Sequence, residues 1–426
     1  MDSELQQAGV NWAGNHAYRA AGIVVPETTD QLREIAATAP KLKVLGSRHS
    51  FNDVADSEGI LVSLGALGAE IEIDNDARTV SVGGGVRYGE LARVLDEHGW
   101  AVHNLASLPH ISIAGAVATG THGSGDRNGA LATAVRGIEV ITSDGELHTI
   151  RMGDADFDGS VVALGALGVV TRVELAIEPS FQVRQQVYLD LPWGAVVENI
   201  DAILASAYSV SLFTDWSERG VQQVWQKIRL DEPSGPVESP AELFGAPPAD
   251  RRMHPIAALD AVSCTEQLGI PGPWFERLPH FRMDFTPSSG AEIQSEYLLP
   301  RSRVQEAIEA MRPLSAQITP LLLVSEIRSM RADRLWLSEA YGRDTVAFHF
   351  TWIRDGAKVQ NVLPLIEDAL RPYDARPHWG KVFVSGPDEL NRLYPELPRF
   401  RELAGRMDPR GAFRNAFTDR YVFTTD

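Results

Sequence analysis

The sequence predicts an α+β protein of more than one domain. Its 426 residues exceed the usual size of a single domain, which is about 100–200 residues. The first 180 residues contain many glycines and alternate short apolar runs with helical patterns, as is typical of a mixed α/β domain. Segments 230–250 and 271–290 are rich in proline, serine and glycine, and we expect them to be long loops inside a second domain.

Each element of the first part has a local signal. Residues 29–39 carry apolar side chains at helical spacing, with Thr29 or Asp30 as the expected N-cap. Gly99 is expected to close a second helix, and the pair Asp144 and Gly145 joins two alternating runs into a predicted hairpin. The other elements expected in this part are strands at 42–46, 77–85 and 101–105, a helix at 88–99 and the hairpin strands within 135–150.

The second part is expected to combine strands with helices. We expect strands at 321–328 and 345–352 and helices at 301–312 and 362–370. The final segment, 413–423 (FRNAFTDRYVF), is aromatic and basic, and should therefore dock on the body of the protein.

Charge and composition disfavour several classes of function. The net charge is -18 and the pI is near 5.1, so nucleic acid and anionic membrane surfaces are poor partners. A single cysteine, Cys264, allows no intrachain disulfide and is expected to be a small buried hydrophobe. The first residues do not resemble a signal peptide, and no apolar run approaches the about 20 residues of a membrane helix. We expect a cytoplasmic protein.

Two glycine-rich segments differ in what they indicate. Residues 83–89 (GGGVRYG) join a strand to a helix, but no acid ends the next strand, so nicotinamide binding is rejected. Residues 46–52 (GSRHSFN) follow a strand with small and polar residues whose backbone N–H groups suit a diphosphate, although an ordinary polar loop is equally compatible. Residues 107–125 combine small apolar residues with glycine, serine and threonine, which favours a large flat ligand in place of missing side-chain volume.

Ionisable residues recur on one face of the two long strands. By alternation, Glu326 and Arg328 share a face with Leu322 and Val324. On residues 345–352, His349 and Thr351 share a face with Ala347, whereas Val346, Phe348, Phe350 and Trp352 point the other way. A solvated ion pair between Glu326 and Arg328, worth under about 1 kcal/mol, is the alternative to a polar cavity.

Other residues give weaker signals. Lys381 follows a glycine in HWGK and, on sequence alone, is more typical of a surface residue than of a site. The eleven histidines show no HExxH or paired Cys/His spacing, so no metal is expected. The chain also lacks the GxSxG signature of many hydrolases.

Taken together, these segments resemble the vanillyl-alcohol-oxidase-type FAD family, and within it the alditol oxidases. The likeness covers nearly the whole chain, and Arg48 departs from the commoner family glycine. The matching runs are NWAGN from Asn11, GSRHSFN from Gly46, VGGGVRYGELARV from Val82, ASLPHISIAGAVATGTHGSG from Ala106, ALGALGVVT from Ala163, SVSLFTDW from Ser209, CTEQLGIPGPW from Cys264, HFRMDFTPSSGAEIQSEYLLP from His280, EIR from Glu326, AYGRDTVAFHFTW from Ala340 and RPHWGK from Arg376.

The resemblance implies a domain arrangement and a cofactor. It implies an FAD-binding α/β domain at 1–180, a substrate domain with an antiparallel sheet flanked by helices at 181–381, and a C-terminal segment at 382–426 that completes the first domain. It also implies FAD attached covalently through His49. The further FAD contacts that it implies are Val44, Leu45, Gly46, Ser47, Arg48, Ser50, Ser107, Ser112, Gly115, Ala116, Val117, Ala118, Val169 and His378.

The implied reaction is oxidation of the terminal CH–OH of an alditol, such as xylitol or sorbitol, to the aldose. A hydride passes to flavin N5, and dioxygen reoxidises the flavin to give hydrogen peroxide. Lys381 and Arg328 are expected at the reacting hydroxyl, with His349 as an alternative proton acceptor. The implied substrate-binding residues are Ser107, Glu326, Arg328, Thr351 and Lys381.

Three alternatives differ in substrate or class. An aldonolactone oxidase or dehydrogenase of the same fold would act on a cyclic sugar lactone. A flavin-carrying electron-transfer protein would have no alcohol chemistry of its own, and a nicotinamide dehydrogenase would be colourless. Both oxidase and dehydrogenase behaviour are compatible with the sequence.

Overall fold

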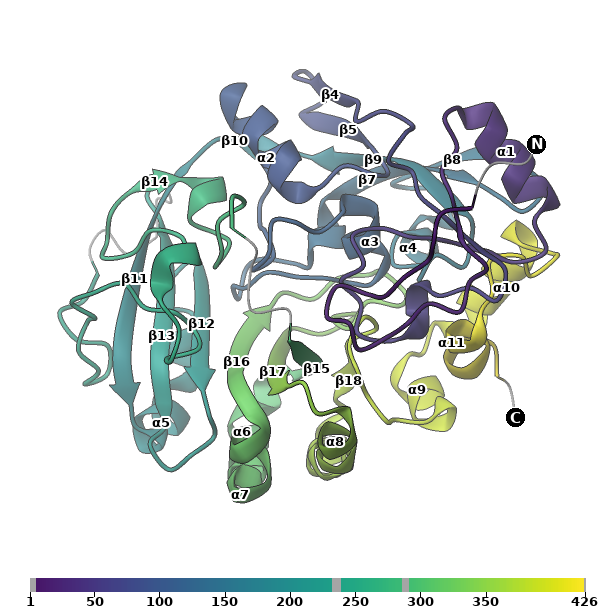
Figure 1. Ribbon diagram of the computed structural model, residues 1–426. Helices are drawn as coiled ribbons and strands as arrows, with labels where there is room; N and C mark the ends of the chain where they lie inside the picture. The colour runs from purple at the N-terminus through teal and green to yellow at the C-terminus, as the bar shows by residue number, and fades with distance from the viewer. Residues whose placement is uncertain (1–4, 232–238, 286–290, 425–426) are drawn as a thin grey trace.

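The N-terminal part of the chain begins with a small parallel sheet. The computed structural model describes residues 5–231, 239–285 and 291–424 (Figure 1). Strands β1 (Ile23–Val24), β3 (Ile60–Val62) and β2 (Leu42–Val44) form this sheet in that order, beside helix α1 (Thr29–Thr38). The strand β2 ends where the GSRHSFN loop begins, so the sheet places that loop.

A five-stranded antiparallel sheet completes the N-terminal layer. The predicted hairpin is confirmed, and its turn uses Gly145 with a φ of 82°, a conformation that glycine adopts at little cost. In spatial order the strands are β4 (Ile71–Asp74), β5 (Thr79–Gly83), β9 (Val169–Ala176), β7 (Val135–Ile141) and β8 (Leu147–Arg151). The accompanying elements are α2 (Tyr88–Glu97), α3 (Ile113–Ala118), α4 (Phe157–Ser160) and the paired strands β6 (Trp100–Ala101) and β10 (Glu178–Pro179).

The second part is an eight-stranded antiparallel sheet, with helices α5 to α8 on the side away from the N-terminal part (Figure 1). In spatial order its strands are β14 (Gly272–Pro273), β11 (Gln182–Leu191), β13 (Val221–Arg229), β12 (Ser209–Thr214), β16 (Leu322–Met330), β17 (Thr345–Ile353), β15 (Glu292–Pro300) and β18 (Arg376–Pro377). The helices are α5 (Trp193–Leu204), α6 (Val304–Met311), α7 (Ser315–Ile318) and α8 (Gly356–Leu370).

The register of this sheet aligns three ionisable residues across its middle. Glu296 of β15 is opposite His349 of β17, which is opposite Glu326 of β16. Directly opposite residues share a face, so these side chains form a row. Phe348, Phe350 and Trp352 are fully buried in the core on the other face, as the alternation predicts.

The C-terminal segment returns to the first part of the chain. Helices α9 (Pro387–Leu393), α10 (Leu397–Met407) and α11 (Ala416–Thr418) and a π-helical turn, Asp419–Phe423, lie beside it (Figure 1). Phe417 is fully buried, which confirms that the end of the chain docks on the body. The boundaries at 180 and 381 remain predictions.

Four sequence-based expectations were inaccurate. The N-cap of α1 is Thr28, whose Oγ1 accepts a hydrogen bond from the Gln31 amide. Helix α8 begins six residues before the predicted position 362, because Asp355 caps it and Pro364 is accommodated inside it. The strand expected at 101–105 ends at Ala101. Leu322 does not share the face of Val324 as expected. A β-bulge shifts the register between these two residues, so that Leu322 is opposite Trp352 and Val324 is opposite Thr351.

The structure describes only part of the two predicted loops that are rich in proline, serine and glycine, at 230–250 and 271–290. Residues 232–238 and 286–290, the second of which is the whole TPSSG run, lie outside the described residues. Within the described part, a short strand, β14, and a 3₁₀ turn at Trp274–Glu276 interrupt the second loop.

Asn415 joins the C-terminal segment to the first part, and its replacement should destabilise the fold. Its buried amide nitrogen donates to the carbonyl oxygens of Asp53 (3.0 Å), Val54 (3.1 Å) and Asp56 (2.8 Å). We expect Asn415→Ala to lower the free energy of unfolding by about 1–3 kcal/mol, because buried carbonyls lose their donor. Urea unfolding measures this effect. The exposed Asn361→Ala is the control, and an equal change in both variants would contradict the prediction.

Candidate active site

One cavity brings most of the predicted site residues together. Its volume is about 280 Å³, and the N-terminal loops and the eight-stranded sheet both line it. The predicted residues that line it are Val44, Leu45, Gly46, Ser47, Arg48, His49, Ser50, Ser107, Ser112, Gly115, Ala116, Ala118, Glu326, Arg328, His349, Thr351, His378 and Lys381. Their individual roles remain predictions, but the structure places them around one space.

Two predicted FAD contacts do not line this cavity. The side chains of Val117 and Val169 are buried in hydrophobic clusters instead. Val169 begins β9, and its neighbours Gly168 and Val170 do line the cavity. Strand alternation therefore directs the Val169 side chain to the core.

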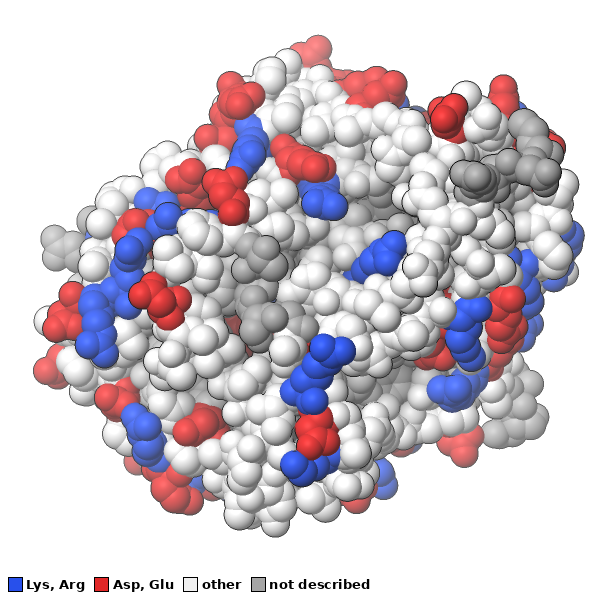
Figure 2. Space-filling view, in the orientation of Figure 1, with Lys and Arg blue, Asp and Glu red and all other residues white. Residues whose placement is uncertain are grey.

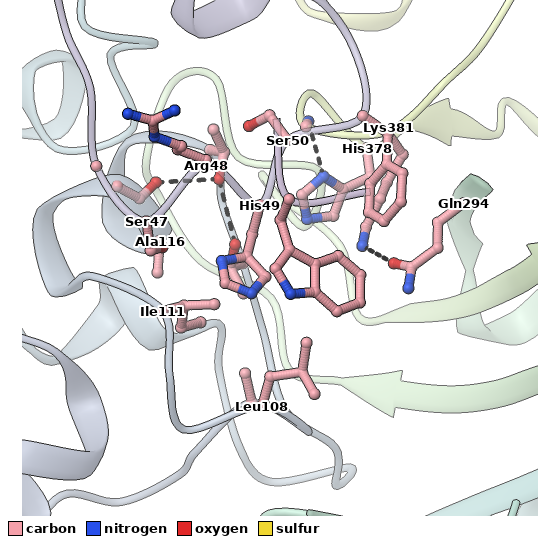
Figure 3. A pocket seen from close by; sticks show the side chains of 18 of the residues that line it. Ser47, Arg48, His49, Ser50, Leu108, Ile111, Ala116, Gln294, His378 and Lys381 are labelled. Atoms are coloured by element: carbon pink, nitrogen blue, oxygen red, sulfur yellow. Dashed lines mark hydrogen bonds between the residues drawn. The ribbon is translucent and has the colours of Figure 1, made fainter. Parts of the chain in front are cut away.

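His49 projects into the cavity from the loop after β2 (Figure 3). Ser47 Oγ accepts a hydrogen bond from the Ser112 amide (3.1 Å), which ties this loop to the start of α3. The indole of Trp12 stacks on the imidazole at 5.2 Å between centroids. Both ring nitrogens of His49 are buried and meet no side-chain hydrogen-bond partner among the described residues, and burial lowers the pKa of His49 to about 4 although the Ser47 backbone opposes this shift. The imidazole is therefore neutral and free to bond to a ligand.

Arg48 stands where the family pattern has glycine, in a backbone conformation that glycine favours. Its φ is 63°, in the left-handed region where glycine is favoured. The guanidinium donates to the carbonyl oxygen of Ala8 (3.0 Å) and lies over the Tyr18 ring. These contacts offset the conformational cost, so the turn is retained without glycine.

The unpaired imidazole and the glycine-rich walls fit an FAD. At Gly46 and Gly115 an added Cβ would lie only 2.5 Å and 2.7 Å from Ser112 Oγ, so the loop and the helix pack closely around this hydroxyl. The cavity then extends from this loop to the sheet, where hydrogen-bonding side chains replace the glycines. One end therefore suits a flat cofactor and the other a polar substrate.

Glu296, which the sequence analysis did not single out, is the centre of a buried charge cluster. Its carboxylate lies 2.8 Å from Arg328 Nη2, 3.2 Å from His122 Nε2 and 3.2 Å from His349 Nδ1. Burial opposes ionisation, but these neighbours hold the pKa of Glu296 well below its ordinary value. Glu296 is thus an anion that holds Arg328 at the cavity wall.

Glu326 is also ionised, and it is not the solvated half of an ion pair. His280 Nε2 lies 2.9 Å from its Oε1, and Arg328 Nε lies 3.5 Å from its Oε2. Burial alone would raise the pKa of Glu326. Arg328 and His280 have the larger combined effect, and they hold this pKa below its ordinary value. Glu326 and Arg328 are 5% and 6% exposed, which excludes the alternative of a surface pair.

His349 presents one nitrogen to the cavity. Its Nε2 lies 3.1 Å from Thr351 Oγ1, while Nδ1 faces Glu296. The carboxylate favours a proton on Nδ1, which leaves Nε2 as the acceptor. Burial lowers the pKa of His349, so the ring is neutral near pH 7.

Lys381 is largely withdrawn from solvent, contrary to the surface position that HWGK suggests on its own. Its ammonium donates to Gln294 Oε1 (Figure 3) and lies 4.8 Å from the centre of the Phe51 ring. Burial lowers the pKa of Lys381 to about 8, although Glu296 opposes this shift. Lys381 is therefore a cation at neutral pH that deprotonates readily.

Sequence reasoning missed five residues of this region, and only two had a usable signal. Gln294 and Glu296 alternate on β15, so they share the site-facing side of that strand. The other three come from separate loops or a distant strand, and only the fold brings them near the cavity. They are His122, Lys227 and His280.

The described residues contain no group of three or more potential metal ligands. None of their helices is long and apolar enough to cross a membrane. Acidic and basic side chains are interspersed on the face in Figure 2.

Known families and proteins match this chain at several levels. A family model described as FAD binding domain matches residues 20–151, and one described as D-arabinono-1,4-lactone oxidase matches residues 289–421. Alditol oxidase from Streptomyces sp. (strain IKD472 / FERM P-14339) is 48% identical over 97% of this chain and 98% of that protein. L-gulono-1,4-lactone dehydrogenase from Mycobacterium tuberculosis (strain ATCC 25618 / H37Rv) is 26% identical over the same shares.

A solved structure supports the same assignment at the level of the fold. Cholesterol oxidase from B. sterolicum superposes with a TM-score of 0.76, covering 98% of this chain and 97% of that one at 17% identity. The sequence match to alditol oxidase extends over both parts of the chain. The chain therefore belongs to the alditol oxidase family of vanillyl-alcohol-oxidase-type FAD enzymes.

Proposed function

We propose that this protein oxidises the terminal CH–OH of alditols such as xylitol and sorbitol to the aldose, with FAD bound covalently through His49. The identity to a Streptomyces alditol oxidase supports the substrate class. The unpartnered nitrogens of His49 support the covalent link. An FAD held by His49 would supply a hydride acceptor and a route for the electrons to dioxygen, with hydrogen peroxide as the product.

The polar wall of the cavity carries the substrate assignment. Ser107, Glu326 and Thr351 offer hydrogen-bonding groups from three different segments, and Arg328 lies 3.4 Å from Ser107 Oγ. Arg328 is paired with Glu296 and Glu326 in this wall, so the site suits a neutral chain of hydroxyls better than a charged sugar acid.

The positive charges of Lys381 and Arg328 act on the oxygen of the reacting hydroxyl. Both cations face the cavity, where they would stabilise negative charge that develops on the substrate oxygen. His349 takes the hydroxyl proton at Nε2, because its Nδ1 faces Glu296 and its ring is neutral. The resulting imidazolium is then stabilised by Glu296.

This assignment predicts an alkaline limit to activity. The rate of anaerobic flavin reduction by xylitol should fall as pH rises through about 8, because the pKa of Lys381 is lowered to about 8 by burial and the cation is lost. In Lys381→Arg the fall should move above pH 10, because guanidinium stays protonated. Stopped-flow rates from pH 6 to 10 measure both profiles. A rate that instead rises through pH 8 would make neutral Lys381 the base.

The substrate class is tested by comparing peroxide formation with xylitol, sorbitol and L-gulono-1,4-lactone. We expect kcat/KM for the alditols to exceed that for the lactone by at least about tenfold, since a ring cannot place its hydroxyls along an extended polar wall. A preference for the lactone would favour the aldonolactone oxidase alternative, which the family match at residues 289–421 keeps relevant.

A further inference from the structure

Two buried ionisable residues next to Glu326 have no place in the reaction described so far: His280, which lines the cavity, and Lys227, which does not. Lys227 belongs to β13 and is 1% exposed, while His280 follows the 3₁₀ turn at Trp274–Glu276 and is 5% exposed. Lys227 Nζ lies 3.1 Å from His280 Nδ1, and His280 Nε2 lies 2.9 Å from Glu326 Oε1. The three side chains form one chain of hydrogen bonds.

The direction of these bonds follows from the donors present. A lysine amine next to Nδ1 donates to it, so Nδ1 carries the lone pair and Nε2 carries the proton. Lys227 also donates to the Leu278 carbonyl oxygen. Burial lowers the pKa of His280 to about 4, so the ring stays neutral in this tautomer and donates to Glu326.

The backbone of His280 contacts a second predicted substrate-binding residue. The amides of His280 and Phe281 both donate to the Ser107 carbonyl oxygen, each at 3.2 Å. The His280 carbonyl oxygen accepts from the Thr265 amide at 2.9 Å. One residue therefore bonds to Ser107 through its backbone and to Glu326 through its side chain.

Aromatic packing restricts the imidazole to this orientation. The rings of Phe213 and Trp225 lie edge-on to it, at 5.4 Å and 5.2 Å between centroids. Phe213 is also directly opposite Glu326 in the pairing of β12 with β16. Rotation of the imidazole would therefore displace packed rings and break two hydrogen bonds.

We propose that His280, held in one tautomer by Lys227, is a positioning residue that fixes Glu326 relative to Ser107 and so determines recognition of the substrate hydroxyls beyond the reacting carbon. This inference rests on the proposed alditol oxidation. His280 acts through Glu326 and is not placed at the reacting atoms. Without the N–H of His280, the Glu326 carboxylate would turn towards Arg328. The substrate hydroxyl that donates to Glu326 would then lose its partner.

The experiment compares His280→Leu, His280→Gln and Lys227→Met in the FAD-loaded enzyme. Leucine removes the donor, whereas glutamine retains an N–H near the position of Nε2. Lys227→Met removes the group that fixes the tautomer at similar volume. KM and kcat are measured with xylitol and with a pentitol that lacks one interior hydroxyl.

We expect His280→Leu to raise the KM for xylitol at least about tenfold with kcat within about threefold, because hydroxyl binding is lost equally in ground and transition states. Its preference for xylitol over the deoxy compound should fall by a similar factor. His280→Gln should recover most of the loss, and Lys227→Met should show an intermediate increase in KM. The control is His103→Leu, which removes an imidazole that does not line the cavity and should leave KM unchanged.

Unchanged KM and unchanged preference in His280→Leu would overturn the inference, as would equal losses in the leucine and glutamine variants. If the leucine variant fails to fold, Lys227→Met decides the question. The inference is overturned if Lys227→Met keeps the KM of the unmodified enzyme and its preference for xylitol over the deoxy compound. An unmodified enzyme that xylitol does not reduce would overturn the proposed function, and the inference with it. An active parent with unaltered variants would overturn the inference alone.

Discussion

Lys381→Ala and Arg328→Ala are each expected to lower the rate of anaerobic flavin reduction by xylitol by about 10²–10³-fold, while FAD stays bound. Removing one group that stabilises developing negative charge in a dry site costs about 2.7–4 kcal/mol. Arg328→Ala also leaves Glu296 and Glu326 without the cation between them, which lies 2.8 Å from Glu296. Single-turnover stopped-flow absorbance measures the rate directly.

The control for these two variants is Lys358→Ala, because the Lys358 side chain is 63% exposed on α8. Flavin content and the melting temperature show whether a variant is folded and loaded. Reduction within about threefold of the parent rate in both Lys381→Ala and Arg328→Ala would show that neither cation acts on the reacting hydroxyl.

His49→Ala is expected to abolish covalent attachment of the flavin. The imidazole is the group in the GSRHSFN loop with both nitrogens unpaired and a pKa lowered to about 4 by burial, so it is neutral and nucleophilic. Acid precipitation should release all yellow colour from the variant and none from the parent. The exposed His148→Ala should retain covalent flavin. Flavin that stays with precipitated His49→Ala would place the attachment elsewhere.

Alternation on the strands predicted the polar wall well. Glu326, Arg328, His349 and Thr351 all line the cavity, because residues two apart on a strand share a face. The same rule misplaced Leu322, because the β-bulge at that end of β16 has no clear sequence signal. Local periodicity therefore predicts faces only where pairing stays regular.

The charge network behind the wall was not predictable from local patterns. Lys227 and Glu326 are nearly a hundred positions apart, and only the order of strands β13, β12 and β16 brings them near each other. His280 reaches Glu326 from a loop whose path depends on packing against the sheet. Contacts of this kind depend on tertiary structure, whereas Glu296 shares the site-facing side of β15 and could have been found by alternation.

Arg48 shows how a family pattern can be altered without loss of the turn. The left-handed φ at this position is one that glycine favours, and the Ala8 and Tyr18 contacts of Arg48 compensate for its strain here. The sequence revealed the departure, but its compensation required the position of the N-terminal residues.

The central claim is that a flavin held by His49 faces a cavity that recognises a neutral polyol. The most direct test mixes the purified enzyme with xylitol in the absence of oxygen and records the flavin absorbance near 450 nm. The account predicts complete bleaching, followed by return of the colour and one peroxide per flavin when air is admitted. Absorbance that stays unchanged at saturating xylitol and sorbitol would contradict it.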